Sequence, residues 1–211
     1  ALVQFDRLIE VDVISDASPK SLFDALSREK YDVLHLACHG DEDGRLVLED
    51  RAGLVTAVDP DEFARMVSDR VRFVFVSACY GEKAVARLSG EKFAIIAADG
   101  AYPIETGAVT VFAREFYRNL FSGEIFGDAV SRARDALYWD STFGHRVFPD
   151  LVGKEPPPYK RFLSFGDTAT RLSSPVEGKV LVRHVPDRSF QRYLGDDPAV
   201  GCAPLQLVVS R

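Results

Sequence analysis

Runs of consecutive apolar residues constrain the fold of this chain more than any other feature. Residues 32–37 (DVLHLA) and 71–77 (VRFVFVS) are almost continuously apolar, and residues 93–98 follow the same pattern. A strand that is apolar on both faces belongs in a parallel sheet covered by helices on each side. The sequence therefore predicts an open α/β sheet, mostly parallel, with helices on both faces.

Helical patterns separate these runs. Ser18 followed by Pro19 is typical of a helix start, with a capping side chain and a proline at the first helical position. Asp59, Pro60 and Glu62 form a second start with the spacing of a capping box. Apolar residues then recur at helical spacing further along the chain. The helices predicted in this way span residues 18–26, 59–68, 82–89, 106–120 and 128–138.

Two departures interrupt the alternation of strands and helices. Residues 45–48 and 54–57 flank a short polar turn and predict a small β-hairpin inserted in the α/β order. After Trp139, residues 148–159 hold four of the eleven prolines and predict a loop. Residues 162–164 predict one more edge strand.

The pattern weakens from residue 173 onward. This tail contains two isolated strand candidates, residues 179–184 and 205–210. We expect one domain over residues 1–172 and a C-terminal extension of unknown role over residues 173–211.

Composition excludes several classes of protein. The 26 basic and 32 acidic residues give a net charge of −6, which argues against general binding of nucleic acid. No apolar run approaches the length of about 20 residues that spans a bilayer, so we expect no membrane association. The chain shows no signal peptide and begins at Ala1, which suggests a fragment or a processed product. Three cysteines make no disulfide framework, so we expect a reducing, cytoplasmic setting.

Reactive residues follow two of the predicted strands. His39 and Gly40 come after the first run, and Cys79 comes after the second. If these strands are neighbours, the imidazole and the thiol face each other, and the imidazole can raise the thiolate fraction of the cysteine. The N–H groups of Gly40 and Cys79 are then free to bind a developing oxyanion. Taken singly, each residue is more typical of core packing or of a turn than of catalysis, and only their order and spacing shift the balance. Cys38, which points opposite to His39, is interpreted as packing.

These motifs, in this order, resemble those of CHAT domains, which are caspase-like cysteine peptidases of clan CD. The resemblance covers about residues 8–172. Beyond the two reactive segments it includes the hairpin, the loop after the third run and the closing strand. The matching segments are residues 31–40 (YDVLHLACHG), 45–50 (RLVLED), 75–81 (FVSACYG), 102–105 (YPIE), 116–120 (FYRNL), 128–133 (DAVSRA) and 161–167 (RFLSFGD).

The resemblance implies a caspase-like sheet and a role for each matching residue. His39 would be the general base and Cys79 the nucleophile, with the N–H groups of Gly40 and Cys79 as the oxyanion hole. No metal and no cofactor are implied. The residues that would line the substrate site lie at the end of the second run and after the third: Ser77, Asp99, Tyr102 and Glu105.

The preference at the cleaved bond stays open at this point. Asp99, Glu105 and Glu82 are acidic and could select Arg or Lys in the substrate. Alternatively, Asp99 forms a turn with the following glycine and Glu105 caps the next helix. A neutral pocket for a larger apolar side chain is a third option.

Two ion sites are also conceivable. A zinc site could be drawn from His35, Cys38, His39 and Cys79, but the spacing lacks the paired C-x-x-C typical of structural zinc, and His35 lies within a strand. The acidic residues 41–43 could bind calcium, steer a basic substrate or form a solvated turn, and the solvated turn is the default.

The sequence thus predicts a cysteine endopeptidase that performs regulated, limited cleavage of a protein or peptide substrate, in bacterial stress or immune signalling. A regulatory repeat or sensor module outside this chain is the expected partner, because relatives of this type are usually joined to one. The alternative is a catalytically silent caspase-like scaffold, and the reactivity of Cys79 distinguishes the two.

Overall fold

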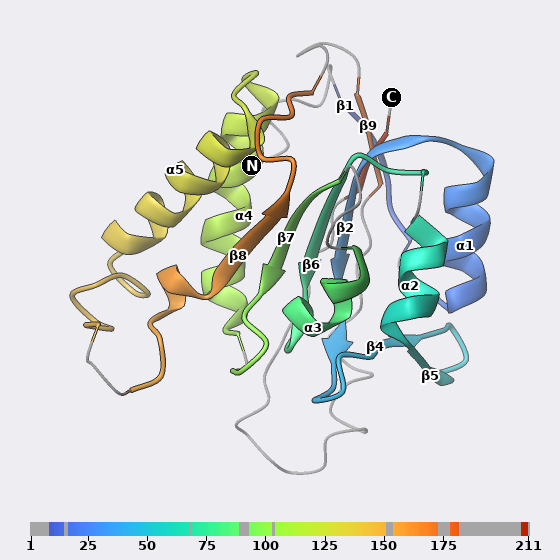
Figure 1. Ribbon diagram of the computed structural model, residues 1–211, viewed down its shortest axis with the longest axis horizontal. Helices are drawn as coiled ribbons and strands as arrows, with labels where there is room; N and C mark the ends of the chain where they lie inside the picture. Colours follow the sequence, from blue (N-terminus) through green and yellow to red (C-terminus); the bar gives the residue numbers. More distant parts are fainter. Residues whose placement is uncertain are drawn as a thin grey trace.

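The computed structural model of the protein describes residues 9–14, 17–67, 69–88, 93–102, 104–150, 154–172, 178–181 and 208–210 (Figure 1). Its main sheet has the strand order β1-β10-β9-β2-β6-β7-β8. The pairs β2–β6, β6–β7, β2–β9 and β1–β9 are parallel, whereas β8 and β10 run antiparallel to their neighbours. The predicted, mostly parallel α/β sheet is therefore confirmed. Its strands are β1 (Ile9–Asp12), β2 (Tyr31–Ala37), β6 (Phe73–Ser77), β7 (Ala94–Ala98), β8 (Phe162–Gly166), β9 (Gly178–Leu181) and β10 (Val208–Ser210).

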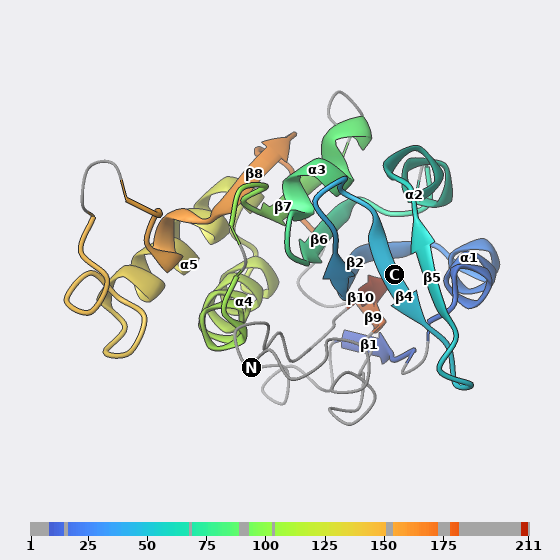
Figure 2. The ribbon, with the colours of Figure 1, turned by 90° about the horizontal axis from the view of Figure 1, so that it is seen from below.

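Helices cover both faces of this sheet, as predicted. Figure 2 looks onto the carboxyl ends of the central strands and shows α4 and α5 on one side and α1 and α2 on the other. The helices are α1 (Pro19–Arg28), α2 (Pro60–Val67), α3 (Gly81–Val85), α4 (Thr106–Phe121) and α5 (Phe126–Trp139), with short 3-10 turns at Ala86–Leu88 and Pro158–Lys160.

Residues Phe73 to Val76 of β6 show why the second run is apolar without interruption. Phe73 and Phe75 belong to the core beneath α4 and α5, whereas Val74 and Val76 belong to the core beneath α1, α2 and α3. Each of these side chains is about 1 % exposed or less. Burying one such side chain stabilises the fold by about 1.5–3 kcal/mol, so both faces of this strand contribute to stability.

The core beneath α4 and α5 is built largely from aromatic rings. Phe112 of α4 stacks on Phe162 of β8 with ring centres 4.0 Å apart. Phe75 meets Phe112, Phe116 and Phe162 edge to face. Such pairs add about 0.5–1.5 kcal/mol each beyond the area they bury. This packing fixes α4 against the central strands.

The predicted helix starts are confirmed most clearly at α1. The Ser18 hydroxyl accepts a hydrogen bond from the N–H of Ser21 at 3.1 Å, and Pro19 is the first helical residue. The helix continues two residues beyond the predicted end, to Arg28. The helix expected over residues 82–89 is shorter, because α3 ends at Val85 and continues as a 3-10 turn.

A smaller antiparallel sheet lies beside the carboxyl ends of β2 and β6 (Figure 1). It has the order β3-β4-β5, with β3 (His39–Gly40), β4 (Leu46–Glu49) and β5 (Val55–Val58). The predicted hairpin corresponds to β4 and β5 and is confirmed. The sequence did not predict that His39 and Gly40 would add a third strand to it.

The two strand candidates in the tail join the main sheet. Strand β9 pairs in parallel with β1 and, through Leu181, with Leu34 of β2. Strand β10 pairs with β9 and β1. The other residues of the predicted strands, 182–184 and 205–207, lie outside the described residues, and the domain division at residue 172 stays a prediction. No helix within the described part of the chain is both long and apolar enough to cross a membrane.

Candidate active site

His39 and Cys79 follow neighbouring strands at the same level. Strands β2 and β6 pair in parallel, and Ala37 lies opposite Ser77 at the end of the ladder. His39 comes two residues after Ala37, and Cys79 comes two residues after Ser77. The carboxyl ends of β2, β6 and β7 lie at the bottom of Figure 1, beside α3 and β4. Ligands of open α/β sheets bind outside this edge.

The backbones of the two loops touch at Gly40 and Cys79. A Cβ atom added to Gly40 would lie 1.9 Å from the carbonyl oxygen of Cys79 and 3.5 Å from the Cβ of Ala78. Only glycine allows this approach. The antiparallel pairing of Gly40 with Leu46, and of His39 with Val47, holds the first loop in place. The two residues predicted to form an oxyanion hole are thus in direct backbone proximity.

The chain turns sharply after Cys79. Tyr80 has φ 57° and ψ 23°, which is the left-handed region, and the N–H of Gly81 donates to the carbonyl of Ala78 at 3.1 Å. Such a conformation is unfavourable for a residue with a side chain and concentrates at functional sites. Within the described residues, only Asp69 is another non-glycine residue with positive φ. Backbone strain therefore lies directly beside the candidate nucleophile.

The environment of His39 keeps its imidazole neutral. The side chain is half-buried, and this burial lowers its pKa to about 4. A neutral imidazole has the lone pair that a general base needs, and the same burial makes it a weaker base than a free imidazole. Cys79 is 7 % exposed, so its thiol is also largely shielded from solvent.

The neighbouring Cys38 belongs to the opposite face of the sheet. It packs with Leu36 and Ala78 in the core beneath α1, α2 and α3, which confirms its interpretation as a packing residue. His35 is engaged through both ring nitrogens by Ser77 and Tyr117. His35 and Cys38 thus have separate sets of contacts, and within the described residues no group of three or more histidine, cysteine or acidic side chains could hold a metal ion.

Ser77 lies at the end of β6 and faces inward. It is 8 % exposed, and its Oγ lies 3.0 Å from Nε2 of His35 and 3.4 Å from the carbonyl oxygen of Leu36. The hydroxyl predicted to line the substrate pocket is thus already hydrogen-bonded within the protein.

The loop after β7 contains the acidic residues considered for substrate selection. The carboxylate of Asp99 accepts from the N–H of Ala101 at 2.7 Å, which is the turn that sequence reasoning kept as an alternative. The carboxylate of Glu82 accepts from the N–H of Gly100 at 3.1 Å. Both groups stabilise the loop in this structure.

Tyr102 and Glu105 lie further along the same loop. The guanidinium of Arg161 lies 5.8 Å from the centre of the Tyr102 ring, and the carbonyl of Arg161 accepts from the N–H of Asp99 at 2.7 Å. Glu105 is exposed and occupies the position before α4, but its side chain makes no capping hydrogen bond. The structure thus places Tyr102 against the protein and leaves Glu105 facing solvent.

Helix α3 connects the loops that surround Cys79. Lys83 donates to the carbonyl of Glu42 at 2.7 Å, across to the loop that follows His39. Gly44, with φ +82°, lies so close to this helix that a Cβ would fall 2.6 Å from that of Lys83. No sequence signal pointed to Lys83, because an exposed lysine on a short helix has no distinguishing pattern.

The acidic loop over residues 41–43 is held by its own hydrogen bonds. The Asp41 carboxylate accepts from the backbone N–H groups of Asp43 and Arg45, and from Nε of Arg45 at 2.6 Å. This arrangement matches the turn expected by default.

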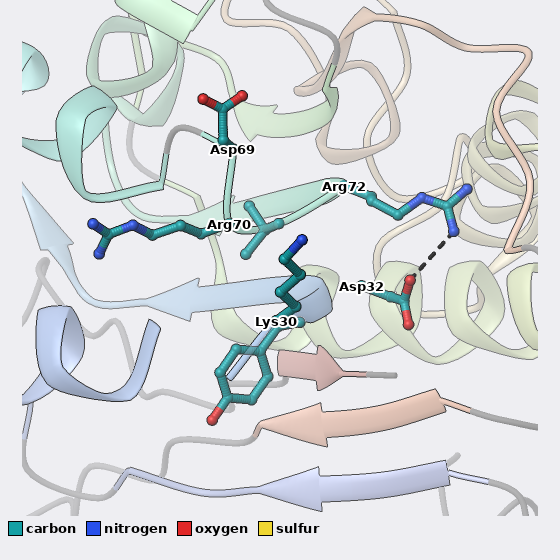
Figure 3. Close-up of a pocket in the computed structure, with 7 residues that line it drawn as sticks. Lys30, Asp32, Asp69, Arg70 and Arg72 are labelled. Carbon is teal, nitrogen blue, oxygen red and sulfur yellow. Dashed lines mark hydrogen bonds and ion pairs between the residues drawn. The ribbon is translucent and has the colours of Figure 1, made fainter. Parts of the chain in front are cut away.

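A pocket of ≈ 180 Å³ lies at the other end of the sheet, between residues 30–32 and 69–72 (Figure 3). The side chains of Arg70 and Arg72 extend in opposite directions, and Arg72 pairs with Asp32 at 3.3 Å. The charged side chains around this pocket do not converge on a common point. The pocket precedes β2 and β6, whereas His39 and Cys79 follow them.

Comparison with known proteins supports the resemblance seen in the sequence. Residues 2–99 match the family model described as CHAT domain. This span contains His39, Gly40, Ser77 and Cys79, and it confirms the resemblance in that part of the chain. No curated protein matches the chain.

Proposed function

From the CHAT domain that residues 2–99 carry, we propose that the chain is a cysteine endopeptidase with Cys79 as nucleophile and His39 as general base. The observation that supports this most strongly is the position of His39 and Cys79, which each lie two residues beyond the paired ends of β2 and β6. The close approach of Gly40 to Cys79 adds to it. This arrangement serves acyl transfer because nucleophile, base and oxyanion donors must converge on one carbonyl.

The proposed reaction uses His39 as proton acceptor and then as proton donor. Neutral His39 takes the proton of the Cys79 thiol as Sγ attacks the scissile carbonyl, and the oxyanion receives hydrogen bonds from the N–H groups of Gly40 and Cys79. The C–N bond then breaks, the amine leaves with the proton from His39, and a thioester remains. Water gives a proton to His39 and attacks the thioester, which releases the acid and returns the proton to the thiolate.

The proposal extends to the substrate and its context. An extended peptide would lie along the loop over residues 99–105 and pair with it as an added strand. The reaction would be regulated, limited cleavage of a protein substrate in the bacterial cytoplasm, as part of stress or immune signalling, with control by a repeat or sensor module outside this chain. The low exposure of Cys79 supports such control, because the site must open to admit a peptide.

The test is selective labelling of Cys79 by short peptides that carry a thiol-reactive group. The panel has basic, acidic and apolar residues at the terminal position, and mass spectrometry identifies the modified cysteine. Selective labelling of Cys79 over Cys38 and Cys202, lost in His39→Ala, is the expected result. Equal labelling of all three cysteines under every condition, including the presence of the regulatory partner, would favour a silent scaffold.

A further inference from the structure

A chain of buried polar groups lies directly beneath the candidate site. Nε2 of His35 is 3.0 Å from Oγ of Ser77, and the Tyr117 hydroxyl is 3.1 Å from Nδ1 of His35. Oγ of Ser77 lies 3.4 Å from the carbonyl oxygen of Leu36. The residues His35, Ser77 and Tyr117 are 1 %, 8 % and 3 % exposed. We call this set the His35 chain.

One direction of donation satisfies every group in the His35 chain. If the Tyr117 hydroxyl donates to Nδ1, then Nε2–H of His35 donates to Ser77, and the Ser77 hydroxyl donates to the carbonyl of Leu36. In the reverse direction the Tyr117 proton would have no acceptor among the described residues. Buried polar groups are rarely left without a partner. The arrangement therefore selects the His35 tautomer with its proton on Nε2.

The surroundings keep the His35 chain uncharged. The imidazole stacks on Phe75, with ring centres 4.3 Å apart and planes inclined by 10°. Burial lowers the pKa of His35 to about 3 and raises that of the Tyr117 hydroxyl. A neutral imidazole between two hydroxyl groups is a fixed spacer and does not transfer a net charge.

The position of the His35 chain relates it to the candidate dyad. His35 lies on β2, four residues before His39, and Ser77 ends β6, two residues before Cys79. Tyr117 adds a third element, α4. The His35 chain thus joins β2, β6 and α4 near the point where the two strands end and the loops of the site begin.

We propose that His35 is a positioning residue: supported by Tyr117, it holds Ser77, and through Ser77 it sets where the loop with Cys79 lies relative to His39. This inference rests on the proposed peptidase function. It gives a role to a histidine that the sequence offered only as a conceivable metal ligand.

The kinetic test uses variants that do not touch the substrate. Tyr117→Phe removes the donor to Nδ1, and His35→Leu removes the link to Ser77, whereas His35→Gln keeps an N–H donor. Val130→Ala in α5 is the matched control, because Val130 is 1 % exposed in the same core but lies on a helix that supplies no group to the His35 chain. Each variant is assayed for kcat, KM and thermal stability on the peptide found by labelling.

We expect kcat to fall by about 10- to 100-fold in His35→Leu and by a smaller factor in Tyr117→Phe, because small displacements of reacting groups have effects of this size. KM should stay within about twofold, and His35→Gln should recover part of the loss. Val130→Ala shows how much kcat falls for a given loss of stability. If kcat in the His35 and Tyr117 variants falls by no more than this, the proposal is overturned.

A spectroscopic readout separates this inference from the proposed function. ¹⁵N NMR of labelled histidine should show that His35 carries its proton on Nε2. In Tyr117→Phe, which lacks the donor to Nδ1, the His35 signals should no longer correspond to that single tautomer. An Nδ1–H tautomer overturns the inference even in an active enzyme. If the tautomer is as expected but the wild type neither cleaves peptides nor labels Cys79 selectively, the proposed function fails and the positioning role fails with it.

Discussion

The contact between Gly40 and Cys79 gives the most demanding prediction. In Gly40→Ala the new methyl group would begin 1.9 Å from the carbonyl oxygen of Cys79, and real Cβ atoms essentially never approach closer than 3.0 Å. The two backbones must therefore separate by at least 3.0 − 1.9 = 1.1 Å. Because both residues supply the proposed oxyanion hole, this displacement acts directly on the reacting geometry.

The magnitude follows from that displacement. A shift of about 1 Å in a catalytic arrangement reduces the rate by about 100-fold. Overpacking of this kind also lowers the free energy of unfolding by about 1–3 kcal/mol. We expect Gly40→Ala to remain folded and to lose about two orders of magnitude in kcat/KM for peptide cleavage, measured under conditions where urea unfolding shows both proteins to be fully native.

Gly127→Ala is the matched control for this prediction. Gly127 lies in the first turn of α5, where a Cβ would come no closer than 3.2 Å to its nearest neighbour, the carbonyl oxygen of Thr168. We expect its kcat/KM to equal that of the wild type. Wild-type activity in Gly40→Ala would refute the oxyanion role of this contact, as would an equal loss in the control.

Three further predictions concern stability. Tyr80→Gly should be more stable than Tyr80→Ala by about 1 kcal/mol in urea unfolding, because both remove the ring but only alanine keeps a Cβ in the left-handed region; equal stabilities would contradict strain at this position. The free energy of unfolding should fall as pH drops from 7 to 5, since the pKa of His35 is about 3 when folded against 6.5 when unfolded, so the unfolded chain binds more protons below pH 6.5. His35 accounts for about 2 kcal/mol of that fall, and an undiminished fall in His35→Gln would be inconsistent with its burial as a neutral group. Cys38→Ser should lower the free energy of unfolding by about 1–3 kcal/mol through burial of a hydroxyl, with peptide cleavage per folded molecule unchanged; a loss of cleavage at constant stability would give Cys38 a role beyond packing.

The central strands could be predicted from sequence because their two faces are both buried. The residues of β6 that precede Ser77 are all apolar and buried, which few other structures require. The positions of His39 and Cys79 followed from the same pattern, since parallel neighbours end at one edge of the sheet. Their alignment needed only the additional fact that β2 and β6 are adjacent.

Other parts of the site depend on contacts between distant residues. Nothing local distinguishes Ser77 as the partner of His35, because the two residues are separated by 42 positions and meet only through strand pairing. The hydroxyl of Tyr117 arrives from a helix 82 residues away from His35. The third strand of the small sheet was missed for a related reason, since two residues, His39 and Gly40, carry no strand pattern of their own.

The placement of β9 has a consequence for the order in which the sheet forms. Each of the four paired residues of β1 meets a residue of β9 that follows it by 169 positions, for example Ile9 and Gly178. In contrast, β2 and β6 pair across 40 positions, as Val33 and Phe73 do. Closing the longer loop costs more entropy, and a ribosome delivers β9 well after β6. During synthesis, β2 and β6, which lead to the candidate dyad, can therefore pair before β9 is available to β1. The candidate site can thus assemble before the outer strands of the sheet.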